Sequence, residues 1–130
     1  MVCIGGLKKH FQKNLKVQAI TFIIHGSSKE DANVFAREMI RTLFPDKNVN
    51  LGFLEVATPS IPVALKEQAD RGATSIRIIP LFLVPGNHVT RDIPKLVTSF
   101  KTENPQIKIT VEPFLGEHPD FKKLLLALAL

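Results

Sequence analysis

The sequence predicts an α/β fold, a three-layer sandwich in which a four-stranded parallel sheet has helices on both faces. Two observations carry this prediction. Four short apolar runs rich in β-branched residues alternate with four segments whose apolar residues recur at three- and four-residue spacing, which is the period of a helix. The apolar runs are nearly continuous, as is typical of strands covered on both faces. Alternating strands and helices of this kind pair in parallel through right-handed crossovers.

The first strand is expected at Gln18–Ile24, where it runs into the turn His25-Gly26-Ser27-Ser28. A helix is expected next, because apolar residues follow helical spacing. They are Ala32, Phe35, Ala36, Met39, Ile40 and Leu43. We expect Ser27 or Ser28 to cap this helix by accepting a hydrogen bond from the backbone of its first turn.

The next two units repeat this order. Val49–Val56 is the second expected strand, and the helix Ile61–Asp70 that follows has Ser60 as its expected cap. Ser75–Leu83 is the third strand, and Asp92 is expected to cap the helix after it. The apolar positions that define that helix are Ile93, Leu96, Val97 and Phe100.

The last unit has a short strand at Ile107–Val111 and a final helix. The helical spacing comes from Phe121, Leu124, Leu125 and Leu128. The apolar run Leu124–Leu130 is far below the ~20 residues needed to cross a bilayer. We therefore expect a helix buried in the core, although a surplus apolar face would serve a dimer equally well.

Residues 17–130 are expected to form a single domain, and residues 1–16 lie outside the repeating pattern. This first segment is basic and contains no acid, so we interpret it as a flexible extension. A weak amphipathic helix over residues 7–15 is the alternative. The four lysines of the segment are Lys8, Lys9, Lys13 and Lys16.

The charge and cysteine content exclude several classes of protein. The chain carries a net charge of +5, but most of the excess lies in the extension, whereas a nucleic-acid-binding protein carries it on a folded surface. Cys3 is the single cysteine, so no intramolecular disulfide or CxxC metal site forms. Together with the absence of signal-peptide and transit-peptide features near Met1, this predicts a protein of the reducing cytoplasm.

Candidate site residues follow three of the predicted strands. His25 follows the first strand, Glu55 lies at the end of the second, and His88 follows the third. Because ligands of open α/β sheets bind at the carboxyl ends of the strands, these side chains are expected to meet at one edge. Imidazole and carboxylate groups suit a divalent transition metal. Each residue alone has a simpler interpretation as a cap, a loop hydrogen bond or a surface ion pair.

The sequence lacks the motifs of three other kinds of functional site. A phosphate-binding loop needs a glycine-rich turn that ends in Gly-Lys-Ser or Gly-Lys-Thr, and a dinucleotide site needs three spaced glycines after the first strand. Only Gly26 stands there. No GxSxG motif occurs, so a hydrolase nucleophile is not supported.

In this context the sequence resembles the small, single-domain sirohydrochlorin cobaltochelatases, a family of class II tetrapyrrole chelatases. The resemblance covers about residues 18–121. Ser28 stands where an arginine is frequent in the family. The segments that carry the resemblance are His25–Ser28, Phe53–Ile61, Pro80–Val89 with Asp92–Pro94, and Leu115–Pro119.

The resemblance implies an enzyme that inserts a divalent metal into sirohydrochlorin or a related tetrapyrrole. It implies no ATP and no organic cofactor, and the metal is a substrate: Co²⁺, Ni²⁺ or Fe²⁺. It further implies a homodimer whose two copies form the cleft for the macrocycle. Neither a nucleic acid nor a membrane is expected as a partner.

We assign roles to the candidate residues on this basis. His25 and His88 are expected to bind the metal through neutral imidazole nitrogens, with Glu55 as a third catalytic group that acts as ligand or base. His118 is a weaker candidate ligand, and we expect it to cap the last helix instead. The residues expected to bind the carboxylates of the substrate are Ser27, Ser28, Lys29 and Arg91.

Two other functions remain open at this point. A carrier that binds metal or tetrapyrrole without inserting one into the other would need much the same residues. A nucleic-acid-associated protein would use the lysines of the N-terminal extension and would bind in a strongly salt-dependent manner.

Overall fold

The order of elements along the chain is the predicted one. The structure is a computed structural model that describes residues 16–46 and 48–130, so the predictions for residues 1–15 lie outside it. Two short turns precede the last two helices: the π-helical turn η1 (His88–Asp92) and the 3₁₀ turn η2 (Leu115–Glu117). The longer elements are β1 (Gln18–Ile24), α2 (Glu30–Leu43), β2 (Val49–Phe53), α3 (Ile61–Asp70), β3 (Ser75–Pro80), α4 (Ile93–Glu103), β4 (Lys108–Val111) and α5 (Pro119–Leu128).

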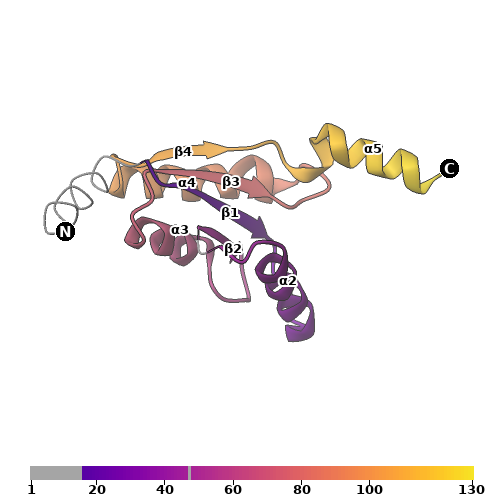
Figure 1. Cartoon of the computed structure of the whole chain (residues 1–130), viewed down its shortest axis with the longest axis horizontal. Coiled ribbons are helices and arrows are strands. Elements are labelled where there is room, and N and C mark those ends of the chain that lie inside the picture. The colour runs from indigo at the N-terminus through magenta and orange to yellow at the C-terminus, as the bar shows by residue number, and fades with distance from the viewer. Residues whose placement is uncertain (1–15, 47) are drawn as a thin grey trace, which may run out of the picture.

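The four strands form one parallel sheet in the order β2-β1-β3-β4 (Figure 1). β1 is an inner strand that pairs with both β2 and β3. In the register of the sheet, Ile24 lies beside Phe53 and Ile23 lies beside Pro80. The carboxyl ends of β1, β2 and β3 therefore lie at one edge, as the sequence predicts.

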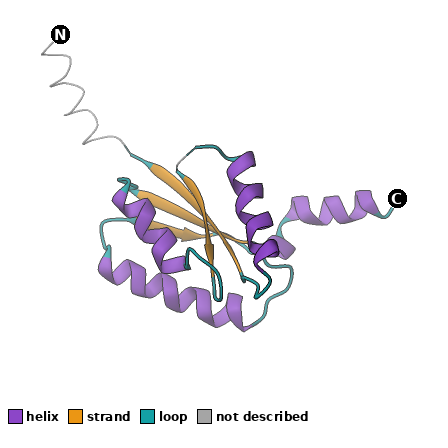
Figure 2. Ribbon diagram, turned by 90° about the horizontal axis from the view of Figure 1, so that it is seen from below, coloured by secondary structure: helices purple, strands orange, loops and turns teal. Residues whose placement is uncertain are grey.

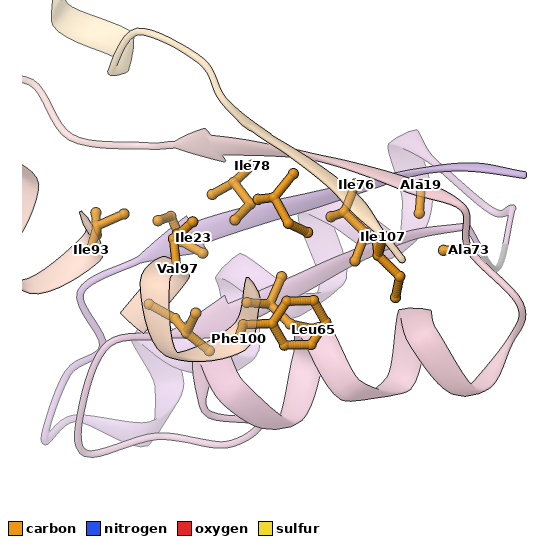
Figure 3. Packing of buried hydrophobic residues seen from close by; sticks show 12 residues of the cluster. Ala19, Ile23, Leu65, Ala73, Ile76, Ile78, Ile93, Val97, Phe100 and Ile107 are labelled. Carbon is orange, nitrogen blue, oxygen red and sulfur yellow. The ribbon is translucent and has the colours of Figure 1, made fainter. Parts of the chain in front are cut away.

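The side chains of β1 alternate between the two faces of the sheet, as the pleat of a strand requires. Ala19 and Ile23 belong to the core that α3 and α4 cover, where Leu65 and Phe100 pack against the sheet (Figure 3). Phe22 and Ile24 point to the other face, against α2. The predicted arrangement of helices on both faces is thus confirmed.

Two of the predicted strands end earlier than expected. β2 stops at Phe53 and β3 stops at Pro80. Val56 has a positive φ of 55°, which turns the chain after β2 away from strand geometry. Past Pro80, Leu81 N still donates to Ile23 O at 2.8 Å, and the chain then continues as a loop. Glu55 and Leu83 consequently lie in loops just beyond the strands.

The predicted helix caps are partly confirmed. The Ser60 hydroxyl accepts a hydrogen bond from Val63 N at 3.3 Å and caps α3. The prediction that Ser27 or Ser28 caps α2 is wrong, because Lys29 occupies the cap position and makes no side-chain bond. The prediction for Asp92 is also wrong. Its backbone is already helical, because η1 leads directly into α4, so its side chain makes no cap hydrogen bond.

The prediction that the C-terminal helix is buried in the core is wrong. α5 extends away from the sheet and the other helices (Figures 1 and 2), and none of its residues is buried. Leu126 and Leu128 are 69% and 73% exposed. The periodic spacing identifies an apolar face but does not say what covers that face. No helix within the described residues combines the length and apolar character that crossing a membrane requires.

Candidate metal site

His25 follows the last residue of β1, and the backbone there is shaped by Gly26. Gly26 has a φ of 97°, and a Cβ at this position would overlap the carbonyl oxygen of Glu55. Only glycine combines this backbone conformation with so close an approach. Gly26 thus lets the loop after β2 lie directly against the loop after β1.

Glu55 is placed beside His25 by backbone hydrogen bonds that continue the β1–β2 ladder past the ends of the strands. Leu54 N donates to Ile24 O at 2.8 Å, and Glu55 N donates to His25 O at 3.0 Å. Glu55 Oε1 then lies 2.8 Å from His25 Nε2. Both side chains remain accessible, at 43% and 56% exposure.

The other ring nitrogen of His25 also has an acceptor as its neighbour. His25 Nδ1 lies 2.9 Å from Gly26 O. Since the carbonyl and the Glu55 carboxylate both accept hydrogen bonds, only a doubly protonated ring satisfies both contacts. Nε2 can bind a metal ion only in a ring that carries no proton on that nitrogen.

His88 lies beside His25 and is the first residue of η1, which follows the loop after β3. Its ring packs edge-on against the His25 ring, with centroids 4.6 Å apart and an interplanar angle of 60°. The Phe82 ring lies on another side of His88, with centroids 6.4 Å apart. His25, Glu55 and His88 are therefore brought together at the sheet edge.

Asp92 contacts His88 from the last position of η1. His88 Nδ1 lies 3.1 Å from Asp92 Oδ2, and Arg91 Nε lies 3.3 Å from Asp92 Oδ1. Removal from solvent acts to raise the pKa of the Asp92 carboxyl, but the hydrogen bonds from His88 and Arg91 and their charges lower the pKa below its usual value. Asp92 therefore accepts hydrogen bonds as a carboxylate.

Ser27 is held in the loop after β1 by a buried side chain. Asn33 of α2 is 3% exposed; its Oδ1 accepts from Ser27 N at 2.9 Å and its Nδ2 donates to Ser27 O at 2.7 Å. The Ser27 hydroxyl accepts from Lys29 N at 3.0 Å. Asn33 thus fixes the path of the chain between His25 and the start of α2.

The remaining predicted substrate-binding residues lie on the surface around this site. Ser28 and Lys29 are exposed at the start of α2, and Arg91 is exposed beside its contact with Asp92. His118 lies after η2, where its Nδ1 accepts from Asp120 N at 3.1 Å and caps α5. The expectation that His118 is a helix cap is confirmed.

The site is not a preformed metal-binding cage. Across residues 16–46 and 48–130, no three His, Cys, Asp or Glu side chains are already placed to hold an ion. A groove of about 570 Å³ lies elsewhere, between α3 and α4, and is lined by residues such as Val63 and Leu96. No histidine lines that groove, so we assign it no part in metal chemistry.

The fold and site can now be compared with known proteins. The family model for CbiX matches residues 19–129. The chain belongs to the CbiX family. This match includes all of β1 except its first residue, the other three strands of the described sheet, and the loops that carry His25, Glu55 and His88.

Relatives of this CbiX chain include two kinds of chelatase. The sirohydrochlorin cobaltochelatase of Methanocaldococcus jannaschii is 40% identical over 86 residues, which are 62% of this chain and 59% of that protein. The chloroplastic sirohydrochlorin ferrochelatase of Arabidopsis thaliana is 31% identical over 103 residues, which are 76% of this chain and 45% of that protein. The CbiX chain thus spans less than two thirds of the length of each.

A solved structure of a similar protein contains a metal. The sirohydrochlorin chelatase SirB from Bacillus subtilis subspecies spizizenii, in complex with cobalt, matches with a TM-score of 0.72 and 26% identity. The match covers 87% of the CbiX chain and 48% of the SirB chain. One CbiX chain therefore corresponds to about half of SirB.

Sequence reasoning missed two residues that shape the site. Asp92 was expected only as a cap, but its four-residue spacing from His88 is the signal that places the two side chains on one side of a helical turn. Asn33 was missed because it is a polar residue among apolar helix positions, and nothing in its spacing distinguishes it from an exposed one.

Proposed function

We propose that this chain inserts a divalent metal ion into sirohydrochlorin or a closely related tetrapyrrole, without ATP. The observation that carries the proposal is the meeting of His25, Glu55 and His88 at one edge of the sheet, in a chain whose relatives include sirohydrochlorin chelatases.

His25 and His88 bind the incoming ion in this proposal. Their rings are in contact, and a neutral imidazole nitrogen suits Co²⁺, Ni²⁺ and Fe²⁺ alike. Two protein ligands leave the other coordination positions of the ion open. The four nitrogens of the macrocycle then replace water and the histidines as the ion passes into the ring.

Glu55 receives protons in this proposal. Insertion forms four metal–nitrogen bonds and breaks two pyrrole N–H bonds, so two protons must leave for each metal ion inserted. The Glu55 carboxylate is accessible to the substrate and already contacts His25 Nε2. The Glu55 carboxylate takes one of the two protons, either directly from the macrocycle or from His25, and solvent takes the second proton.

The surface around the site supports binding of a flat macrocycle with acidic substituents. Val56, Leu83 and Val84 are exposed apolar side chains in the same loops that carry Glu55 and lead to His88, and they suit the face of the ring. Lys29 and Arg91 lie at its border and pair with its carboxylates. Ser27 and Ser28 add hydroxyl groups at the start of α2.

We also propose that two copies of the chain assemble in the cytoplasm to enclose the substrate. One copy matches only 48% of the SirB chain, and its site is open at the sheet edge. The exposed leucines of α5 supply an apolar surface for such a contact. The composition, with a single cysteine, suits a reducing compartment.

Anaerobic absorption spectroscopy tests the proposed activity. Purified protein is mixed with excess sirohydrochlorin and Co²⁺, Ni²⁺ or Fe²⁺ in parallel, and the spectrum reports insertion against the enzyme-free rate. We expect several turnovers with at least one metal, and loss of that activity in His25→Ala and in His88→Ala.

His118→Asn is the matched control, because it removes a histidine outside the site and leaves a residue that caps helices well. It should retain wild-type turnover. Stoichiometric binding of metal or macrocycle with no acceleration for any metal would contradict the proposal and indicate a carrier.

A further inference from the structure

We propose that Asp92 is a positioning residue that keeps the proton of the His88 imidazole on Nδ1, so that Nε2 presents a free lone pair to the metal ion. The inference rests on the proposed role of His88 as a metal ligand. Asp92 is not itself a ligand in this proposal. Its function is to select one of the two tautomers of the ligand His88.

The contacts of the Asp92 side chain carry this inference. One carboxylate oxygen, Oδ2, lies 3.1 Å from His88 Nδ1, and the other, Oδ1, lies 3.3 Å from Arg91 Nε. Because a carboxylate only accepts hydrogen bonds, the contact with Nδ1 requires a proton on that nitrogen. A neutral ring then carries no proton on Nε2.

The local backbone explains why Asp92 is available for this purpose. η1 is a π-helical turn that places His88 and Asp92 at its two ends. Asp92 precedes α4 but makes no cap hydrogen bond. Its carboxylate is therefore directed to His88 and Arg91 rather than to the backbone of the helix.

The two histidines differ in this respect. His25 Nε2 is in contact with Glu55, whereas no group within residues 16–46 and 48–130 forms a hydrogen bond with His88 Nε2. His88 is thus the ring whose ligand atom is prepared before the metal arrives. Carboxylates that orient metal-binding histidines through the second ring nitrogen have this effect in other metal sites.

Asp92→Asn is the sharpest variant, because Arg91 fixes how the new amide is oriented. The guanidinium only donates hydrogen bonds, so it retains the amide oxygen on its own side and turns the NH₂ group toward His88 Nδ1. That NH₂ group donates to Nδ1 and favours the tautomer with its proton on Nε2. The ligand atom is then blocked although the shape of the side chain is unchanged.

Long-range ¹H–¹⁵N correlation spectra of metal-free protein with labelled histidine measure the tautomer directly. At about pH 8.5, where an ordinary imidazole is neutral, we expect the Nδ1–H form of His88 in the wild type and a shift toward the Nε2–H form in Asp92→Asn. The matched control is Asp70→Asn, the same substitution in the exposed Lys66–Asp70 pair of α3. It should leave the His88 signals unchanged.

Titration with Co²⁺ alone, followed by absorption, gives the second readout. We expect Asp92→Asn to bind Co²⁺ about 10- to 100-fold more weakly than the wild type, the range found when outer-shell partners are removed. Asp92→Glu, which retains a carboxylate, should recover part of the affinity. Asp70→Asn should bind as the wild type does.

The inference is overturned if the His88 tautomer is the same in the wild type and Asp92→Asn, or if the tautomer changes while Co²⁺ affinity does not. Failure of the proposed function is seen separately. In that case the wild-type protein gives no metal insertion with sirohydrochlorin, whatever the spectra of metal-free His88 show.

Discussion

At the scale of single residues, the site depends on groups that take no part in its chemistry. Gly26 lets two loops touch, and Asn33 holds the chain between His25 and α2. The histidines and the glutamate are identifiable from sequence because their residue types stand out after strands. A glycine in contact with a backbone carbonyl, or a buried asparagine, has no such signal, because its importance lies in a contact with a distant segment.

Gly26→Ala should destabilise the fold more than Gly72→Ala does. Both glycines have φ above 90°, but a Cβ at position 72 meets no atom within 4 Å, whereas one at position 26 overlaps the Glu55 carbonyl oxygen. The backbone cost of about 1–3 kcal/mol applies to both variants. The overlap adds on the order of 1–3 kcal/mol at position 26 alone, within the range of severe substitutions.

Urea denaturation of the two variants measures the difference. Equal losses in the free energy of unfolding would show that the contact between the two loops does not constrain the fold.

Glu55→Gln should slow metal insertion far more than it weakens binding of the macrocycle. The amide fills the same space but neither accepts a proton readily nor offsets the charge of the ion. General acid–base groups contribute roughly 10²–10⁴-fold to rates, so we expect a fall in kcat on the order of 100-fold with little change in KM.

Steady-state assays with the favoured metal measure kcat and KM separately. Glu103→Gln, on the exposed side of α4, provides the control for loss of one negative charge. An unchanged kcat in Glu55→Gln would assign Glu55 a structural role only.

At the scale of elements, periodicity predicts where strands and helices lie, and hydrogen bonds of individual loops decide where they begin. Ser60 caps α3 as expected, because an extended serine directly precedes the helix. α2 and α4 begin differently. The chain before α2 is bound to Asn33, and the chain before α4 is already helical in η1, so the polar residues that precede these helices are used for other contacts.

Ser60→Ala should lower the free energy of unfolding by about 0.5–1 kcal/mol, the usual range for loss of a cap hydrogen bond. Ser28→Ala is the control, since Ser28 is exposed and makes no cap contact with α2. Its free energy of unfolding should stay within about 0.3 kcal/mol of the wild type, as for other exposed sites. Chemical denaturation of both variants gives the comparison, and a larger loss in Ser28→Ala would contradict the structure at the start of α2.

At the scale of the whole molecule, the apolar faces of α5 and α2 remain open to solvent. The leucines of α5 face solvent, and so do Phe35 and Leu43 of α2, at 72% and 66% exposure. These residues follow the helical spacing that the sequence shows, and for the C-terminal helix that spacing led to the expectation of burial. Helical spacing identifies an apolar face of a helix. It does not tell which surface, in the same chain or in another, covers that face.

Leu124→Glu combined with Leu128→Glu should weaken self-association at least tenfold, because charges would replace the apolar face of α5 in the proposed dimer. Lys122→Glu changes the charge of the same helix at an exposed polar position and should leave association nearly unchanged. Sedimentation equilibrium at several protein concentrations measures both. A wild-type monomer at high concentration, or an equally strong dimer in the double variant, would refute an interface through α5.

The inner position of β1 in the sheet also determines how the site moves. β1 is hydrogen-bonded on both sides, and its ladders continue into the loops at Leu54 and Leu81. Its amide hydrogens should therefore exchange with solvent only through the rarest openings of the molecule, while the amides of η1 exchange sooner. We therefore expect any change in the spacing of the two proposed ligands, His25 and His88, to come from η1 rather than from β1.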